Sequence, residues 1–278
     1  MDHPEAKAGR VIATLSRRRS FQLPAPDRAV RLVERNALLY RRGWLLLISG
    51  FIEPLLYLLA IGFGVGALVS STVTVDGHLV RYAVFVAPAM MATSAMNGAI
   101  FETAFNFFFK LKYVKLYDAV IATPLGIADI ALGEITWALI RGTLYSFGFI
   151  VVMTALGLVA SPWALLALPA AMLIGFTFSA LGTAASTFVR TWQDFDLVLT
   201  VLIPLFLFSA TFYPITVYPG PLQVVVQLTP LYHGVDLLRR LTTGIIGPSL
   251  LVDVAYLAVL GALALAVAAT RLERQLLK

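Results

Sequence analysis

Four ionisable residues stand inside long apolar stretches of this sequence: Glu53, Glu134, Arg141 and Asp253. A charge at the centre of a membrane-spanning helix costs roughly 2.5–3.5 kcal/mol on insertion scales when it has no partner. Glu134 and Arg141 lie two helical turns apart, too far for direct contact along one helix. Each therefore needs a partner on a neighbouring span, and Glu53 with Arg141 is one open possibility. Buried pairs that hold helices in register are favoured over a substrate-lining role.

Signatures of catalysis by the chain alone are missing from the sequence. No Gly-x-x-x-x-Gly-Lys-Ser/Thr phosphate-binding loop occurs, and neither His-Glu-x-x-His nor Gly-x-Ser-x-Gly is present. The chain has no cysteine, and its histidines (His3, His78 and His233) show no metal-ligand spacing. We therefore expect a chain that is not an enzyme and that binds no cofactor or metal of its own.

The elements that must position the four charges are membrane spans. Of the 278 residues, 59% are hydrophobic and only 13% are charged, whereas a soluble protein is about 25% charged. Six segments have roughly the length of the ~20 apolar residues that cross a bilayer, and the fifth is short and contains Pro204. We predict an all-α integral membrane protein with spans at about 43–66, 82–102, 127–157, 163–189, 197–213 and 250–270.

The lysines and arginines orient these spans. With the N-terminus inside, Arg81, Arg239 and Arg240 lie outside, Arg141 lies in a span, and the other seventeen of the 21 are cytoplasmic. This asymmetry follows the positive-inside rule and places both termini in the cytoplasm. The net charge of +6 is thereby explained without a nucleic-acid partner. Residues 1–26 are predicted to be a flexible cytoplasmic tail, because their apolar run is too short for a signal peptide.

A basic amphipathic helix is predicted over residues 27–42, just before the first span. Asp27 is a suitable N-cap, and basic and apolar residues divide between two faces. That division is typical of a helix that lies in the membrane interface, and the chain has no sizeable soluble domain against which it would otherwise pack. The residues assigned to this interface helix are Arg28, Arg31, Arg35, Tyr40 and Arg42.

The loop 103–126, between the second and third spans, is too polar for lipid yet rich in aromatic residues. At helical spacing five residues share one face: Phe105, Phe109, Tyr113, Leu116 and Val120. Lys110, Lys115 and Asp118 fall away from that face. Thr123 and Pro124 predict an N-cap and the first turn of the next helix. The apolar face lies against bilayer headgroups or against a soluble partner protein, and the residues alone leave both open.

Residues 214–247 are apolar but repeatedly interrupted by proline and glycine. Counting them as a seventh crossing would place the basic C-terminus outside, so we predict a re-entrant pair of short helices in the outer leaflet. Non-helical backbone at that depth must be covered by protein, and we expect the segment to pack against other spans or a second subunit. Its assigned residues are Tyr213, Pro214, Pro230, His233, Asp236 and Arg239.

Four local motifs occur in order along the chain. They are Lys-Leu-Tyr-Asp-Ala-Val-Ile-Ala-Thr-Pro-Leu at 115–125, Gly-Glu-Ile-Thr-Trp at 133–137 followed by Arg141, Phe-Ser-Ala-Thr-Phe-Tyr-Pro-Ile at 208–215, and Thr-Pro-Leu-Tyr-His-Gly-Val-Asp-Leu-Leu-Arg-Arg at 229–240. With the predicted layout, they resemble ABC exporter permeases of the type-2 class over roughly residues 27–270. The nodulation lipo-oligosaccharide export permeases are most similar, followed by the anthracycline-resistance permeases. One departure is the Phe-rich start of the inner loop at 105–110, where many relatives are acidic and arginine-rich.

This resemblance implies a half-transporter with two kinds of protein partner. Two permease subunits, as a homodimer or a related heterodimer, would pair around a central path, with a cytoplasmic ABC ATPase docked beneath each. ATP and Mg would bind to those two ATPase copies only. The loop 103–126 would be the coupling helix, in contact with the ATPase through Phe105, Phe109, Lys112, Tyr113, Leu116 and Tyr117.

The resemblance also implies outward movement of an amphiphile across a bacterial cytoplasmic (inner) membrane. A glycolipid or lipo-oligosaccharide is the first choice of substrate and a hydrophobic drug the second. The alternative is a secondary carrier or channel without an ATPase. Carriers often show internal repeats with broken helices in both halves, and here only residues 213–247 are broken, which argues against that alternative.

A cysteine in place of His78 tests the orientation, since the chain has no cysteine of its own. We expect a membrane-impermeant thiol reagent to label His78→Cys in intact cells, because the loop after the first span is predicted to face outside. The same reagent applied to lysed cells is the control. Labelling that appears only after lysis would show that residue 78 faces the cytoplasm and that the predicted orientation is wrong.

Overall fold

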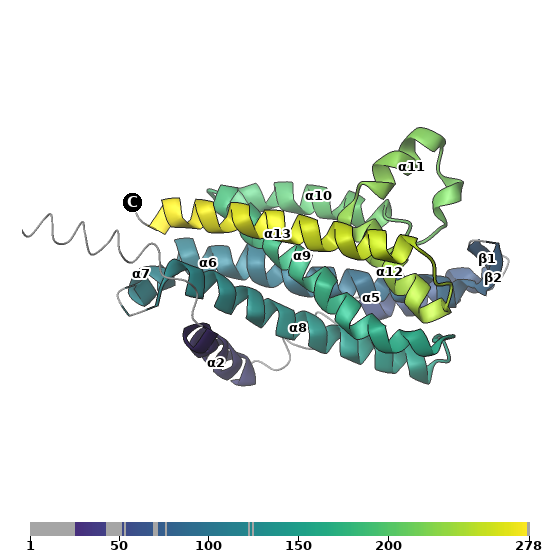
Figure 1. The fold of residues 1–278 in the computed structure, drawn as a ribbon, viewed down its shortest axis with the longest axis horizontal. Helices are drawn as coiled ribbons and strands as arrows, with labels where there is room; N and C mark the ends of the chain where they lie inside the picture. The colour runs from purple at the N-terminus through teal and green to yellow at the C-terminus, as the bar shows by residue number, and fades with distance from the viewer. Residues whose placement is uncertain are drawn as a thin grey trace, which may run out of the picture.

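The computed structural model describes residues 26–42, 52, 54–68, 72–75, 77–121, 123 and 125–276. They form an elongated helical bundle (Figure 1), with α7 (Leu116–Ile121) and the last turns of α13 (Ser249–Leu276) at one end. A hairpin of β1 (Thr72–Val75) and β2 (His78–Arg81) lies at the other end. The other described elements are α2 (Pro26–Arg42), η1 (Leu58–Val65), α4 (Gly66–Leu68), α5 (Tyr82–Ile100), η2 (Phe101–Asn106), α6 (Phe107–Lys112), α8 (Ile127–Ala155), η3 (Pro162–Leu166), α9 (Ala167–Phe188), η4 (Trp192–Asp194), α10 (Phe195–Leu207), η5 (Ile215–Val217), α11 (Gly220–Gln227) and α12 (Pro230–Thr243).

Four helices of the described chain are long and apolar enough to cross a membrane: Tyr82–Lys112, Asp129–Ala155, Pro162–Ser186 and Ser249–Gln275. They correspond to the second, third, fourth and sixth predicted spans. A helical, multi-pass membrane protein is therefore confirmed. The hairpin is the exception to an all-α fold. The sequence Asp-Gly at 76–77 between two short segments is a recognised signal for a β-hairpin. The hairpin was not predicted from the sequence.

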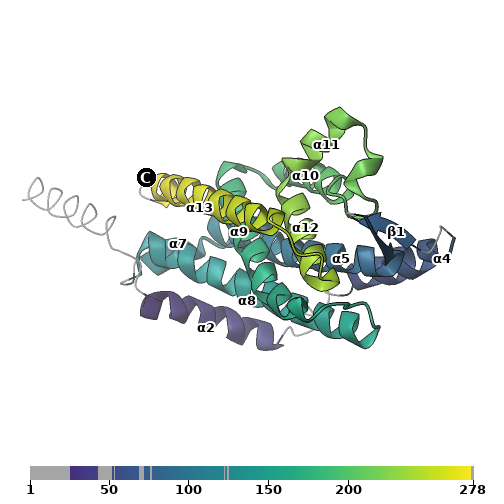
Figure 2. The ribbon, with the colours of Figure 1, turned by 45° about the vertical axis from the view of Figure 1, so that its right-hand side comes forward.

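The other two predicted spans are not confirmed. The first is described only in part, as the apolar helix Pro54–Leu68, and Glu53 lies outside the described residues. The fifth is α10, which has 13 residues and at 1.5 Å per residue extends roughly 20 Å, short of the ~30 Å hydrocarbon core. A helix pair, α11 and α12, occupies the predicted re-entrant segment, and α11 projects from the bundle (Figures 1 and 2). Six crossings and the membrane depth of this pair stay predictions.

The second span runs ten residues beyond its predicted end at residue 102. The helix continues from α5 through the π-helical turn η2 into α6, since no glycine or proline interrupts residues 99–112. It ends at Lys112. The predicted restart at Thr123 is also wrong. α8 begins at Ile127, and the backbone N–H of Gly126 donates to Asp129 Oδ2 at 2.9 Å. The first part of the predicted inner loop is therefore a continuation of the span.

The α5 helix is the buried centre of the bundle and packs against α8, α9 and α12. Nearly every residue of α5 is buried, and many are alanine, which allows neighbouring helix backbones to approach closely. The α13 helix lies on the outside and packs chiefly against α9. At their crossing, Gly261 of α13 faces the ring of Phe176 in α9.

Replacing Gly261 with alanine is expected to separate α9 from α13. A Cβ at that position would lie 2.7 Å from Phe176 Cε1 and 3.2 Å from the Cα of Thr177, and overpacking of this kind costs about 1–3 kcal/mol. The midpoint of thermal unfolding in detergent should fall. Gly64→Ala is the matched control, because outside its chain neighbours and its own helix backbone no atom of the described chain lies within 4 Å of its new Cβ. Equal midpoints for the two variants would contradict the predicted contact.

Candidate functional site

A buried network of four charges joins the second span to the third. Glu102 in η2 and Glu134 in α8 have side chains that are 0% and 1% exposed. Lys110 Nζ of α6 lies between them, 3.2 Å from Glu102 Oε1 and 2.7 Å from Glu134 Oε2. Arg141 Nη1 of α8 forms an ion pair with Glu102 Oε2. Two acidic and two basic groups therefore neutralise one another inside the bundle.

Neutral side chains complete the hydrogen bonding around Glu102. The Tyr40 hydroxyl and Asn106 Nδ2 each donate to Glu102 Oε2 at 2.9 Å. Arg141 in turn donates from Nη1 to the Tyr40 oxygen at 2.9 Å and from Nη2 to the Tyr145 oxygen at 2.7 Å. Tyr40 comes from α2, so the helix before the first span is tied to this network.

Besides Lys110, donors from two further elements reach Glu134. The Tyr117 hydroxyl of α7 donates to Glu134 Oε1 at 2.9 Å, and Asn36 Nδ2 of α2 donates to Oε2 at 3.2 Å. Burial, reinforced by a nearby carboxylate, raises the pKa of both the Tyr40 and the Tyr117 hydroxyl above the ordinary value. Both tyrosines therefore keep their protons at physiological pH and remain donors.

This arrangement answers the question of which partners the intramembrane charges have. The described partner of Arg141 is Glu102, which was not predicted, while the suggested partner Glu53 lies outside the described residues. Lys110 lies off the face of Phe109 and Tyr113 and points inward, because the unbroken helix brings it two turns after Glu102 on the same side. An acidic residue at the end of an apolar span, eight residues before a lysine, is the signal in the sequence that would have identified the pair.

The predicted interface helix, α2, packs along α8 (Figure 2). The Leu32 side chain and the Ala29 backbone lie against Gly133 of α8. Arg31 is exposed and forms an ion pair with Glu34 at 3.1 Å, and Arg35 is partly buried. Tyr40 faces the charge network instead of the surface. Arg28 and Arg42 belong to α2, and their side chains lie outside the description. A position of α2 in the membrane interface stays a prediction.

The six residues assigned to ATPase docking divide into two groups. Phe109 and Tyr113 are 49% and 56% exposed, and their rings stack at 5.5 Å; Lys112 is exposed beside them. Phe105 instead stacks on Phe195 at 4.4 Å, Leu116 is partly buried, and Tyr117 is fully buried. The accessible part is therefore residues 109–113, the last residues of α6 with Tyr113, which we name the turn after α6. Tyr117 offers no surface to a partner in this structure.

Buried polar contacts also hold the helix α12. His233 Nδ1 and Asp253 Oδ1 of α13 lie 2.7 Å apart, and the ring of Tyr256 stacks on His233 at 3.9 Å. Asp253 thus has its partner on a neighbouring element, as expected of a charge in a span. Asp236 pairs with Arg240 one turn along α12, at 2.7 Å. No group of three or more His, Asp or Glu side chains in the described chain is arranged to hold a metal ion.

Arg239 secures the break between α10 and α12. It is 4% exposed and donates to the backbone oxygens of Phe85 and Ala210, at 3.2 and 2.8 Å. Its guanidinium also lies 3.8 Å from the centroid of the Phe85 ring. In this broken region the Tyr213 ring packs near Tyr218, Pro214 precedes η5, and Pro230 opens α12. Arg239 thus covers the Ala210 carbonyl, just before the predicted re-entrant segment.

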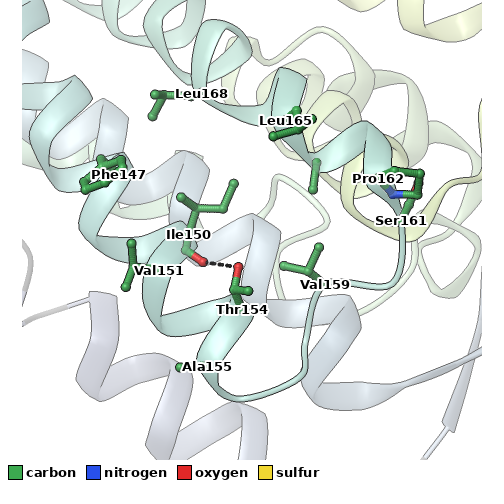
Figure 3. A pocket seen from close by; sticks show the side chains of 11 residues that line it. Phe147, Ile150, Val151, Thr154, Ala155, Val159, Ser161, Pro162, Leu165 and Leu168 are labelled. Atoms are coloured by element: carbon green, nitrogen blue, oxygen red, sulfur yellow. Dashed lines mark hydrogen bonds between the residues drawn. The ribbon is translucent and has the colours of Figure 1, made fainter.

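Two apolar hollows lie elsewhere in the bundle. One, of 680 Å³, sits between the end of α8 and the start of α9, with Phe147, Ile150, Val151 and Leu168 among its lining residues (Figure 3). Its Thr154 hydroxyl already donates to the Ile150 carbonyl at 2.7 Å. The second, of 580 Å³, lies between the helix Pro54–Leu68, α5 and α10. No described residue that lines either hollow is charged, so both suit apolar groups.

Comparison with known proteins gives a consistent result. A sequence model of the family described as "ABC-2 type transporter" matches residues 29–242. Nodulation protein J of Rhizobium meliloti (strain 1021) is 33% identical over 212 residues, which is 76% of this chain and 79% of that protein. Nodulation protein J of Rhizobium leguminosarum bv. trifolii is 34% identical over the same shares of the two chains. Nodulation protein J of Azorhizobium caulinodans is 26% identical over 86% of this chain and 95% of its own.

The energetic coupling between Lys110 and Glu134 can be measured with a double-mutant cycle. Lys110→Met would leave Glu134 and Glu102 buried with less compensation, and removing one partner of a buried pair costs about 3–5 kcal/mol. The double variant Lys110→Met/Glu134→Gln should lose less stability than the sum of the two single variants, because it removes both charges together. Thermal unfolding in detergent measures all three.

The exposed pair of Arg31 with Glu34 provides the control. Arg31→Gln should change stability by no more than about 1 kcal/mol, since its side chain is 76% exposed. Strictly additive losses for Lys110→Met and Glu134→Gln would show that the two residues are not coupled.

Proposed function

The chain belongs to the ABC-2 type transporter family, and from that premise we propose that it is the transmembrane permease subunit of an ATP-driven exporter. The chain is a multi-pass membrane protein, and its sequence contains no phosphate-binding loop. A permease of this kind must therefore receive energy through a protein contact. A separate cytoplasmic ATPase, which binds ATP and Mg, is the partner that the proposal requires.

The exposed turn after α6 is the proposed contact with that ATPase. Phe109 and Tyr113 present a stacked aromatic pair beside Lys112, and aromatic side chains are enriched at protein interfaces. The turn directly follows a helix whose buried residues carry the charge network. A push on this surface would therefore reach the centre of the bundle through α6 and α5. This is the observation that carries the proposal.

Two copies of the permease, identical or related, are proposed to pair around a central path with two ATPase subunits. The outward side of α10 supports a further contact in the membrane, since Leu197, Val201 and Ile203 are each more than half exposed. Such an apolar face suits either lipid or a second permease subunit. The basic end of the chain, with the turn after α6 and the C-terminal end of α13, is proposed to lie in the cytoplasm. The membrane is proposed to be a bacterial inner membrane.

The proposed substrate is amphiphilic and moves outward. The relatives carry the name nodulation protein J, in keeping with the resemblance to nodulation lipo-oligosaccharide export permeases. A glycolipid or lipo-oligosaccharide is therefore the first choice, and a hydrophobic drug the second. The uncharged hollow between the helix Pro54–Leu68, α5 and α10 is compatible with the apolar part of either.

The test is a change of the aromatic pair in a reconstituted complex. Phe109→Ala/Tyr113→Ala is expected to reduce co-purification of a co-expressed ATPase and to lower transport-coupled ATPase activity in lipid. Truncation of a hot-spot residue at an interface costs about 2 kcal/mol or more, so binding should weaken by about tenfold or more if this pair is central to the contact. The permease alone should remain folded, because both side chains are largely exposed.

Trp163→Ala is the matched control. Trp163 is 52% exposed and lies in η3, at the end of the bundle away from α7, so its loss should leave ATPase assembly unchanged. Normal assembly and turnover in the Phe109/Tyr113 double variant would mean that this turn is not the coupling surface.

A further inference from the structure

A basic pocket of 510 Å³ lies where the ends of α6, α9 and α13 meet. Four of its lining residues are cationic: Lys112, Arg190, Arg271 and Arg274. None of the described lining residues is acidic; the others are Thr187, Phe188, Val189 and Gln275. The pocket is separate from the buried charge network, in which each cation has a carboxylate partner. A concentration of cations without acids in one hollow favours an anionic ligand.

The central cation of the basic pocket is held in place by its neighbours. The guanidinium of Arg271 lies 3.6 Å from the centroid of the Phe188 ring, and its Nε donates to Thr187 Oγ1 at 3.2 Å. Gln275 Nε2 donates to the Thr187 carbonyl at 2.6 Å, which fixes the end of α9 against α13. The Nη groups of Arg271 donate to no side chain or backbone atom of the described chain. They are thus available to bind an acceptor, and a planar guanidinium suits phosphate oxygens.

The carboxylate of Asp194, in the connection between α9 and α10, already accepts backbone hydrogen bonds. Asp194 Oδ2 accepts the backbone N–H groups of Arg190 and Thr191, at 2.8 and 3.0 Å. These hydrogen bonds hold the pKa of Asp194 below its ordinary value, so it stays ionised and offsets part of the Arg190 charge. Lys112, Arg271 and Arg274 have no carboxylate partner in the described chain. The pocket therefore retains a net positive charge.

An exposed apolar surface adjoins the basic pocket on the side toward the middle of the bundle. Phe188, at its rim, is 56% exposed. Val267 and Leu263 lie one and two turns before Arg271 on α13 and are 44% and 61% exposed. A ligand with an anionic group and an apolar chain would contact both surfaces. A phospholipid has this shape, and basic pockets between helices at the cytoplasmic membrane surface are a known setting for anionic headgroups.

We propose that the basic pocket binds the phosphate of an anionic phospholipid, with its acyl chains along α13. The headgroup would bridge the ends of three helices that are far apart in sequence. Lys112 belongs both to this pocket and to the exposed turn after α6. The bound lipid would therefore steady the end of the helix that leads into that turn. The pocket is built by this chain alone and does not depend on the proposed ATPase.

The test uses the purified full chain in neutral detergent and native mass spectrometry. Phosphatidylglycerol and phosphatidylcholine with the same acyl chains are added separately, and inorganic phosphate is added as a competitor. We expect phosphatidylglycerol to bind more tightly than phosphatidylcholine. Arg271→Gln/Arg274→Gln should weaken phosphatidylglycerol binding by about 30-fold, and Arg274→Gln alone by about fivefold. The single variant keeps the test valid if loss of the Arg271–Phe188 stack destabilises the fold.

Lys115→Gln is the charge-matched control, because Lys115 is exposed near the same end of the molecule but does not line the pocket. Its phosphatidylglycerol affinity should equal that of the unchanged chain. Equal binding of the two lipids, or unchanged binding in both pocket variants, would overturn the proposal. Displacement of the lipid by inorganic phosphate at equal concentration would assign the site to a soluble phosphate instead. Unchanged lipid binding with a loss of ATPase co-purification would identify the pocket as a protein contact.

Discussion

The structure depends on the mutual neutralisation of Glu102, Lys110, Glu134 and Arg141 inside the bundle. Removing an ion from water costs several kcal/mol, and a buried pair repays that cost only when its geometry is good and its remaining hydrogen bonds are made. Here Lys110 bridges both carboxylates, while two tyrosines and two asparagines donate to them. The donors come from α2, η2 and α7. Separating α2 or α7 from α8 would leave buried carboxylate oxygens without hydrogen bonds, and separating η2 would break the Glu102–Arg141 ion pair. The charge network therefore reinforces an arrangement that these elements also hold through a small apolar cluster of Leu32, Phe107, Tyr117 and Ile130.

A similar constraint operates at the opposite end of α5. There the chain leaves α10 in an irregular path, with Ala210 at a φ of +53°, and Arg239 hydrogen-bonds to the backbone of both Ala210 and Phe85. Phe85 and Glu102 belong to one continuous helix, 17 residues or roughly 26 Å apart. Nearly all of α5 is buried between its neighbours. This helix consequently connects the polar anchor of the broken segment to the charge network at the other end.

The sequence was sufficient for the parts of the fold that depend on apolar length and charge placement. Four spans, the need for buried partners and the helix pair after α10 all follow from such patterns. It was insufficient where tertiary contacts decide. Lys110 was predicted only to lie off the face of Phe109 and Tyr113, and the buried partners Glu102 and Glu134, to which the continuous helix brings it, were not predicted. Tyr117 was assigned to the ATPase contact on the family resemblance, but its hydroxyl donates to Glu134 of α8 and it is buried. Periodicity identifies a face of a helix and does not identify what lies against that face.

Lys110 and Lys112 show how one short helix can serve two environments. Two residues apart on an α-helix place side chains about 200° apart, so α6 directs Lys110 into the charge network and Lys112 into the basic pocket beside α9 and α13. The aromatic turn of Phe109 and Tyr113 lies at the end of the same helix. A force on that turn cannot be absorbed by bending of α6 alone, because Lys110 anchors the helix to two buried carboxylates. Displacement of the turn would instead move α6 together with η2 and α5, or break buried charge pairs that are costly to lose. The charge pairs that stabilise the bundle would thus also transmit a force from the turn after α6 to the centre of the bundle.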